Sequence, residues 1–213
     1  MSSILILNEN ELQNLVKLDL EIVESIKKGF SELEKGNATV PPIMMIPVPE
    51  KTGEVDIKSA YIKGVDRLAV KVASGFFENS KLGLPSASGL MLVLSSETGF
   101  LKGVLLDNGY LTQVRTGAAG AAVAEFLAPE KVENAGVIGS GLQARFQMRG
   151  LYLKRKFSTI RMFSLDSEDV KNEYVKDMES ELGVKVIKAS SVEEVVKNSE
   201  SVVTTTPARK GYI

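Results

Sequence analysis

The stretch VENAGVIGSGLQARFQ, from Val132 to Gln147, passes from an apolar strand through a glycine turn into a helix. In such a turn Gly139 makes the tight bend, Gly141 lets the backbone approach a pyrophosphate, and the small Ala144 lets the helix pack on the strand. Backbone N–H groups at the start of the helix would then face the phosphates. The same glycine spacing also occurs in purely structural strand-to-helix turns, so the flanking pattern has to decide between the two interpretations.

Downstream of this turn, strand-like and helix-like segments alternate, which favours dinucleotide binding over a structural turn. Alternation of this kind predicts a parallel, doubly wound sheet of Rossmann type. A complete fold of this type has about six strands, and the pattern reaches only a fourth before Ile213, so this domain is expected to be incomplete at its C-terminus. The expected strands are 135–138, 159–163, 185–188 and 201–204, and the expected helices are 142–154, 168–182 and 192–197.

Upstream, residues 40–110 contain short β-rich runs separated by turn clusters, which indicates an α+β region with a mostly antiparallel or mixed sheet. A strand at 4–7 and helices at 10–17 and 19–35 precede it, and a helix of small residues at 112–127 follows. The predicted fold class is therefore α/β. An α+β domain at 1–113 precedes a truncated Rossmann-type domain at 114–213.

The second strand of the Rossmann pattern should end near the residue that binds the adenosine ribose. Ser164 and Asp166 lie 25 and 27 residues after Gly139, somewhat beyond the usual spacing of about 20. Asp166 either accepts a hydrogen bond from the ribose 2′-hydroxyl or caps the helix that begins near Glu168, and the sequence leaves both open. Because no arginine directly follows the strand, NAD is preferred as the cofactor, with NADP not excluded.

Two absences restrict the chemistry of these 213 residues, which contain no cysteine and no histidine. Thiolate nucleophiles, Ser-His-Asp triads and histidine- or cysteine-ligated metal sites are excluded, and no metal is expected. Acid–base steps must use carboxylates, lysines, tyrosines or a cofactor, which suits hydride transfer by a nicotinamide. The net charge of −1 predicts no nucleic-acid or membrane partner. No signal peptide or transmembrane run is evident, so a cytoplasmic protein is expected.

Two cations stand in unusual surroundings. Lys71 lies between Val70 and Val72 in a predicted strand, and Arg115 lies at the start of the small-residue helix. Either could be a solvated charge on an apolar stem. A half-buried cation usually needs an anionic partner, so the pair also fits recognition of a substrate carboxylate.

Four stretches, in this order, resemble the ornithine cyclodeaminase/mu-crystallin family. Within that family, VDIKSAY, GFFENSKLGLPS and LLDNGYLT are most similar to proteins associated with ectoine utilisation. The likeness extends over essentially the whole chain. The four stretches are KVASGFFENSKLGLPSASG, LSSETG, LLDNGYLTQVRTGAAGAAVAEFLA and VIGSGLQARFQ.

The resemblance implies a homodimer whose first domain binds substrate and dimerises and whose second domain binds NAD(P). It implies that Lys71 is catalytic and contacts the substrate, and that Arg115 contacts substrate and cofactor. It also implies that Asp166 or Ser164 binds the ribose. The remaining implied cofactor contacts are Ser86, Thr116, Gly139, Gly141, Leu142 and Gln143.

Two departures from the family bear on the substrate. Ile43, Met44 and Met45 stand where many members carry an arginine, and Lys58 stands where the ornithine enzyme has a carboxylate, which makes ornithine a poor candidate. The family's catalytic aspartate would follow Ile213. Upstream carboxylates such as Asp107 resemble solvated loop residues.

The resemblance therefore implies an NAD-dependent, cyclodeaminase-like enzyme that acts on a small amino acid or diamino acid through an imine at Cα. An NAD(P)-dependent imine reductase, an amino-acid dehydrogenase and a non-catalytic cofactor- or ligand-binding protein remain as alternatives. Residues 1–213 alone are expected to bind the cofactor weakly and to turn over no substrate.

Overall fold

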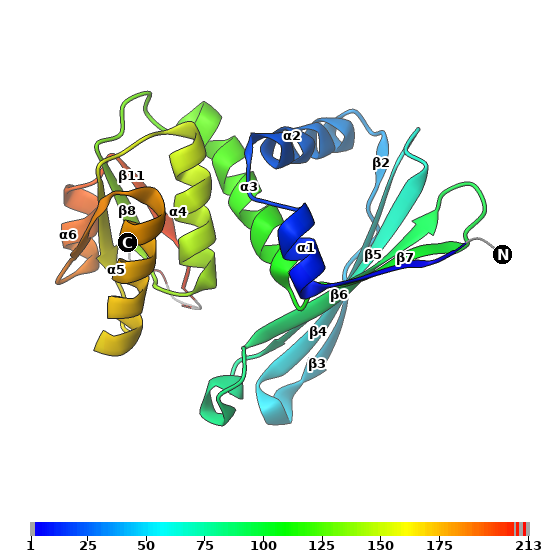
Figure 1. Ribbon diagram of the computed structural model, residues 1–213, viewed down its shortest axis with the longest axis horizontal. Coiled ribbons are helices and arrows are strands. Elements are labelled where there is room, and N and C mark those ends of the chain that lie inside the picture. The colour runs from blue at the N-terminus through cyan, green and yellow to red at the C-terminus, as the bar shows by residue number, and fades with distance from the viewer. Residues whose placement is uncertain (1–2, 207, 209–210, 212–213) are drawn as a thin grey trace. The chain divides into compact units, whose positions relative to one another are not determined.

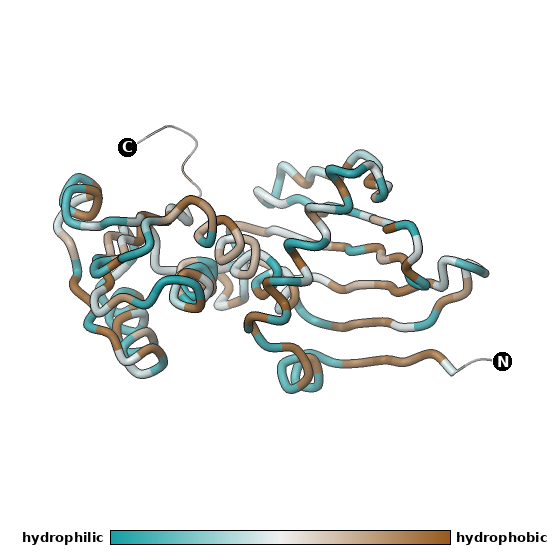
Figure 2. Tube along the Cα trace, turned by 90° about the horizontal axis from the view of Figure 1, so that it is seen from above, coloured by the Kyte–Doolittle hydropathy of each residue, from teal (hydrophilic) through white to brown (hydrophobic). Residues whose placement is uncertain are grey.

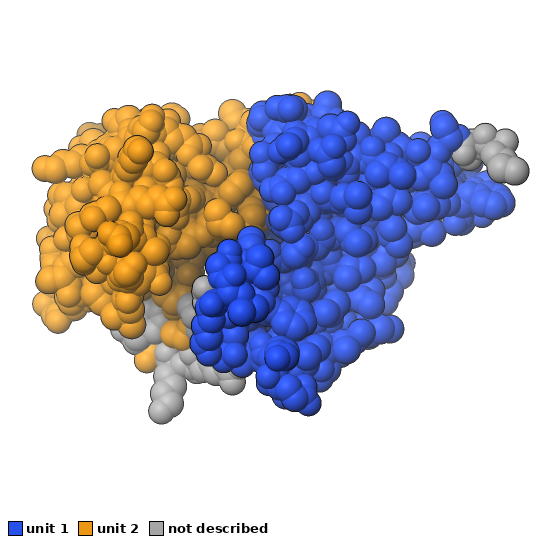
Figure 3. Space-filling model, turned by 60° about the horizontal axis from the view of Figure 1, so that its bottom comes forward, with its two compact units in different colours: residues 1–17, 28–112 blue, residues 18–27, 113–213 orange. Residues whose placement is uncertain are grey.

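The computed structural model describes residues 3–206, 208 and 211, and its contacts divide the chain into two compact units (Figure 3). Unit 1 is Met1–Lys17 with Lys28–Thr112, and unit 2 is Leu18–Lys27 with Gln113–Ile213. Residues 18–27, which the sequence pattern placed in the first domain, thus group with unit 2. The end of the predicted second domain, residue 213, lies outside the described residues.

Unit 1 is built on a mixed sheet which, within the described residues, has seven strands (Figure 1). The strand order is β1-β7-β6-β5-β4-β2, and β3 pairs with the first half of β4, residues 53–57. Strand β1 is parallel to β7, and the other pairs are antiparallel. The mixed sheet was predicted, although the two-residue β2 was not. The strands are β1 Leu5–Asn8, β2 Ala38–Thr39, β3 Met44–Val48, β4 Gly53–Ile62, β5 Arg67–Phe76, β6 Ala87–Ser95 and β7 Leu101–Leu106.

The two faces of this sheet differ in chemistry, because side chains alternate along each strand. One face carries Lys71 of β5. The other carries apolar rows that the register aligns across the strands, and Figure 2 shows these strands largely in the hydrophobic colour. Among the described residues, Leu12 of helix α1 (Glu9–Leu15) is the only buried apolar side chain in unit 1. The aligned rows are Met44–Ile57–Val72–Leu90 and Ile6–Val104–Leu92–Val70.

Unit 2 contains a parallel sheet with the strand order β10-β9-β8-β11 over the residues that the structure describes. This is the order 3-2-1-4 of a Rossmann fold, so the prediction of a doubly wound parallel sheet is confirmed. The elements are β8 Asn134–Ile138, α4 Leu142–Lys154, β9 Thr159–Phe163, α5 Glu168–Leu182, β10 Lys185–Lys188, α6 Val192–Lys197 and β11 Ser201–Thr204.

The hydrophobic core of unit 2 packs these helices against the parallel sheet. Met148 of α4, Tyr174 and Met178 of α5 and Ile160 of β9 are fully buried in one cluster. In a second cluster Val23 of helix α2 (Leu20–Glu34) packs on three alanines of helix α3 (Tyr110–Leu127), Ala118, Ala121 and Ala122. The small residues of α3 therefore serve close packing. None of the described helices has both the length and the apolar character that crossing a membrane requires.

Candidate functional site

The glycine turn between β8 and α4 has the geometry that an anion requires. Gly139 has a φ of +118°, and a Cβ there would lie 2.6 Å from Thr205 Oγ1. Gly141 is the N-cap of α4 with an ordinary φ of −77°, and a Cβ added to it would meet nothing within 4 Å. Among the described residues no side chain caps α4, whereas Ser167 and Ser191 cap α5 and α6. The first amides of α4 therefore remain available, with open space in front of Gly141.

A hydroxyl–carboxylate cluster joins this turn to the end of β9. Ser140, only 1% exposed, donates its hydroxyl to Asp166 Oδ2, and Ser164 donates to the same oxygen at 2.7 Å. These two hydrogen bonds, first that from Ser140, hold the pKa of Asp166 below its usual value. Ser167 caps α5, so the alternative in which Asp166 caps this helix is wrong. The role of Asp166 toward a ribose stays a prediction.

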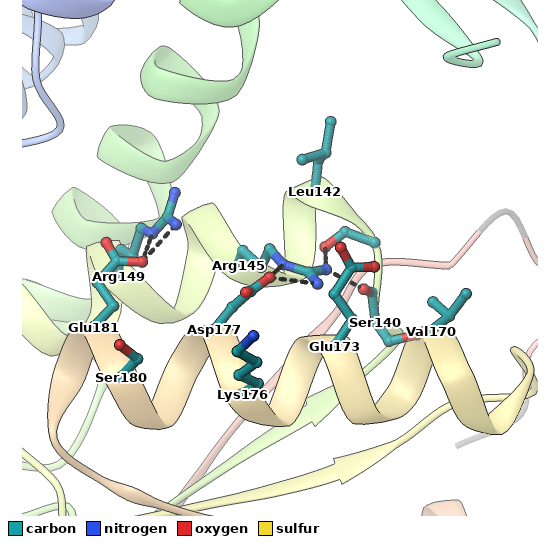
Figure 4. Close-up of a pocket in the computed structure, with 11 residues that line it drawn as sticks. Ser140, Leu142, Arg145, Arg149, Val170, Glu173, Lys176, Asp177, Ser180 and Glu181 are labelled. Atoms are coloured by element: carbon teal, nitrogen blue, oxygen red, sulfur yellow. Dashed lines mark hydrogen bonds and ion pairs between the residues drawn. The ribbon is translucent and has the colours of Figure 1, made fainter. Parts of the chain in front are cut away.

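Arg145 is a site residue that the sequence did not indicate. The residue is 9% exposed, and its side chain lines a groove of about 660 Å³ between α4 and α5 (Figure 4). Nη1 donates to Ser140 O at 2.5 Å, and Nε donates to Asp177 Oδ2 at 2.9 Å. The guanidinium carbon also lies 5.2 Å from the ring centroid of Tyr174. A buried arginine thus holds the carbonyl side of the glycine turn.

The other predicted cofactor residues of unit 2 lie on α4 and α3. Leu142 is exposed on the first turn of α4, where Gln143 Nε2 donates to Gln113 Oε1. Within the described part of the chain, the buried Gln143 Oε1 has no hydrogen-bond partner. Thr116 contributes its backbone carbonyl to Gln147 Nε2 at 2.9 Å. Arg115 is exposed on α3, although neighbouring protein atoms still desolvate its guanidinium enough to lower its pKa.

In unit 1, Lys71 lies half-buried in β5 and donates Nζ to Thr112 Oγ1 at 3.3 Å. The register places Lys58 of β4 directly opposite Lys71, so both ammonium groups share one face of the sheet. Like charges in opposed positions destabilise a sheet, and Asp56 offsets one of them through an ion pair with Lys58 at 2.8 Å. These three side chains therefore form a charged cluster with one excess positive charge, beside the apolar Met91 in the same row of the sheet.

Ser86 and Asp107 also belong to unit 1, in different settings. Ser86 is exposed in the loop before β6, and its carbonyl accepts from Phe76 N at 2.8 Å. Asp107 is 1% exposed and accepts a hydrogen bond from Leu111 N at 2.9 Å, so it caps the first turn of α3. The expectation that Asp107 is a solvated loop residue is wrong. No group of three or more Asp or Glu side chains within the described residues is placed to hold a metal ion.

The mixed sheet of unit 1 and the parallel sheet of unit 2, whose first strand leads through a glycine turn into a helix without a side-chain cap, define a two-unit α/β protein of the Rossmann class. It belongs to the ornithine cyclodeaminase/mu-crystallin family, whose model matches residues 3–213. The family expected from the sequence motifs is thus confirmed.

Three similar proteins illustrate the range of the family. An uncharacterised cyclodeaminase of Sinorhizobium fredii is 42% identical over 209 residues, which are 98% of this chain and 63% of that protein. The Thermococcus litoralis Δ1-pyrroline-2-carboxylate reductase in complex with NADH and L-proline superposes with a TM-score of 0.91 at 30% identity, covering 97% of this chain and 63% of that one. An archaeal alanine dehydrogenase dimer with bound NAD gives 0.86 at 30% identity, with 97% and 62% covered. The chain therefore spans slightly less than two thirds of the length of these relatives.

Proposed function

We propose that unit 2 binds NAD at the glycine turn and that the protein catalyses hydride transfer at the Cα of a small amino acid or of its imine. Cyclodeaminase-type turnover is the leading form of this chemistry. The observation that carries the proposal is the uncapped N-terminus of α4, with open space in front of Gly141 and the Ser140–Asp166 cluster beside it. The names of the three relatives, a cyclodeaminase, an imine reductase and an amino-acid dehydrogenase, support the reaction class.

The residues of unit 2 fit a dinucleotide. The first amides of α4 would donate to the pyrophosphate, as helix N-termini do for anions. Asp166 already receives two hydroxyls on Oδ2, so Oδ1 is the oxygen that would accept from a ribose hydroxyl. Because the pKa of Asp166 is lowered, its carboxylate is ionised at neutral pH and would repel a 2′-phosphate, which favours NAD over NADP. When bound, NAD supplies a hydride acceptor and, once reduced, a hydride donor.

The charged face of unit 1 fits the other reactant. Lys71 would hold the substrate carboxylate, and Lys58 opposite it adds a second positive charge to the same face. Arg115 and the Ser86 hydroxyl are proposed to contact the substrate or the cofactor. The Asp56 carboxylate on this face is already paired with Lys58, so the distal ammonium of ornithine would have to compete with Lys58 for it, which makes ornithine a poor candidate. The likeness to ectoine-utilisation proteins stays a prediction that rests on the sequence motifs.

We further propose that a second copy of the chain covers the apolar face of the unit 1 sheet. The rows through Val72 and Leu92 have no buried member, although every strand of the sheet contributes to that face. A sheet face of this character is normally buried. The dimer named for the archaeal alanine dehydrogenase supports the same assembly.

Calorimetric titration with NAD and NADP tests the cofactor, with NAD expected to bind more tightly; no binding of either would refute the proposal. Incubation with NAD and a panel of amino acids, diamino acids and cyclic imines then tests the chemistry. Ammonia release without net NADH indicates cyclodeamination, and a change in NADH indicates a dehydrogenase or reductase. NAD binding without either indicates a binding protein or a chain that needs further residues for turnover. Turnover by residues 1–213 would overturn the expectation that they are inactive.

Lys71→Met tests the substrate site directly. Loss of a charged hydrogen bond costs about 1.5–3 kcal/mol, so binding of carboxylate ligands should weaken roughly tenfold to a hundredfold while binding of the corresponding amides is unchanged. Lys63→Met, at an exposed position after β4, is the matched control and should change neither. Equal weakening of carboxylates and amides by Lys71→Met would assign Lys71 to the fold.

A further inference from the structure

Arg145 is a buried arginine whose guanidinium contacts the carbonyl groups of the glycine turn. Its Nη1 reaches Ser140 O at 2.5 Å and Gly141 O at 3.4 Å. We infer that Arg145 is a positioning residue for the cofactor, which holds the carbonyls of the turn inward so that its amides face the pyrophosphate. The inference rests on the proposed binding of NAD by unit 2.

The geometry of the peptide bond links the two sides of the turn. In a planar trans peptide the C=O and the following N–H point in opposite directions, and no cis peptide occurs within the described residues. When the guanidinium holds the Ser140 and Gly141 carbonyls, it therefore also directs the N–H groups of Gly141 and Leu142 away from itself. These two N–H groups stand at the N-cap and first residue of α4, where a helix presents amides without intrahelical partners.

The guanidinium is itself held from the opposite side. Oδ2 of Asp177 on α5 accepts from Nε at 2.9 Å and lies 2.8 Å from Nη2, so one edge of the guanidinium is held at a single carboxylate oxygen. The ring of the fully buried Tyr174 lies against the guanidinium at 5.2 Å. Because the Asp177 carboxylate neutralises Arg145, the effect on the turn is one of geometry and not of added positive charge.

A second arginine on the same helix serves as an internal control. Arg149, one helical turn along α4, pairs with Glu181 of α5 at 2.5 Å, and Figure 4 shows this pair beside that of Arg145 and Asp177 in the same groove. Arg149 makes no hydrogen bond to the glycine turn among the described residues. A role confined to holding α4 on α5 would therefore be shared by both arginines, whereas positioning of the turn belongs to Arg145 alone.

The first test needs no ligand. Amide hydrogen exchange is measured on peptides that cover residues 139–142 in the wild type, Arg145→Gln and Arg149→Gln. The Gly139 amide, which is protected by its hydrogen bond to Phe163 O at 2.8 Å, should exchange at least about tenfold faster in Arg145→Gln and at the wild-type rate in Arg149→Gln, because loss of the guanidinium loosens the turn that follows it. Unchanged exchange in Arg145→Gln, or an equal rise in both variants, would overturn the inference.

The second test compares two ligands that share adenosine, one of which, ADP-ribose, also carries the pyrophosphate and a terminal ribose. Affinity for ADP-ribose should fall about tenfold to fiftyfold in Arg145→Gln, while affinity for adenosine should change less than about threefold. Arg145→Lys keeps the positive charge without the guanidinium geometry and should restore less than half of the lost affinity. Asp177→Asn should also lower the affinity for ADP-ribose. Full restoration by lysine, or equal losses for both ligands, would overturn the inference. Failure of the wild type to bind ADP-ribose would instead refute the proposed function, and the exchange experiment distinguishes the two outcomes.

Discussion

Gly139 and Gly141 stand two residues apart in the same turn, yet substitution should affect the fold at one position and the cofactor at the other. At Gly141 the φ of −77° is open to any residue, and a Cβ meets nothing within 4 Å. Gly141→Val should therefore lower the melting temperature by no more than about 4 °C, which is the cost of a poorer N-cap residue. Its branched side chain would fill the space that we assign to the pyrophosphate. Loss of two charged hydrogen bonds at about 1.5–3 kcal/mol each predicts at least a hundredfold weaker binding of NAD.

Gly139→Ala should give the opposite result. The φ of +118° is one that side chains rarely adopt, and the new Cβ would lie 2.6 Å from Thr205 Oγ1 and 2.8 Å from Thr205 O. Backbone strain of this kind costs about 1–3 kcal/mol. In a chain of this size each kcal/mol lowers the melting temperature by about 2–4 °C, so a decrease of roughly 2–12 °C is expected before the steric contact is added.

The assay pairs thermal unfolding followed by circular dichroism with calorimetric titration of NAD on both variants. An unchanged affinity for NAD in Gly141→Val would show that the turn has a purely structural role. A large loss of stability in Gly141→Val would contradict the open space in front of it. Wild-type stability in Gly139→Ala would contradict the conformation assigned to Gly139.

Three further substitutions test other parts of the molecule. Asp166→Asn should weaken NAD binding about tenfold or more, by loss of a charged hydrogen bond, and should reduce the preference for NAD over NADP; calorimetry showing both affinities unchanged would remove Asp166 from the ribose site. Hydrogen bonds from Lys154 and then Lys27 lower the pKa of Glu125 to about 2, so its stabilising effect should be complete above a pH of about 4.5 and disappear as the pH falls toward 2. Melting temperatures across this range should show Glu125→Gln below the wild type at neutral pH and equal to it near pH 2, with Glu193→Gln as a surface control; a difference independent of pH would contradict the ion-pair explanation. Met44→Glu, on the apolar face of the unit 1 sheet and 59% exposed, should convert the proposed dimer to monomer in light scattering, whereas Met45→Glu, 57% exposed on the opposite face, should not; the same mass for both variants would contradict the proposed interface.

The parallel sheet of unit 2 could be predicted almost to the residue. The bounds expected for α4, β9, α5, β10, α6 and β11 agree with the structure, because hydrophobic periodicity there changes sharply between strand and helix. The grouping of residues 18–27 with unit 2 could not be predicted. It depends on Val23 packing against Ala118 and Ala121, and contacts so distant in sequence leave no local pattern.

The absence of a local pattern for contacts distant in sequence also explains which candidate site residues could be predicted from the sequence. A glycine turn is visible in sequence because its backbone conformation excludes other residues, as at Gly139. Arg145 gave no such signal, because an arginine in a helix ordinarily faces solvent. It becomes a buried residue only through Asp177 and Tyr174 on another helix. Asp107 was misinterpreted for a similar reason, since its burial depends on the position of α3.

The register of the unit 1 sheet ties the proposed chemistry to the proposed assembly. Lys58 and Lys71 lie opposite each other on one face, while Ile57 and Val72, their neighbours in sequence, lie opposite each other on the other face. A slip of one residue would turn the side chains of the slipped strand to the other face, so one of the two ammonium groups would move from the proposed substrate site into the proposed apolar interface. If a second chain covers the apolar face as proposed, the energy of that contact also favours the register that places Lys71 at the proposed substrate site. In this arrangement loss of the dimer should weaken binding of carboxylate ligands even though no residue of the charged face has changed.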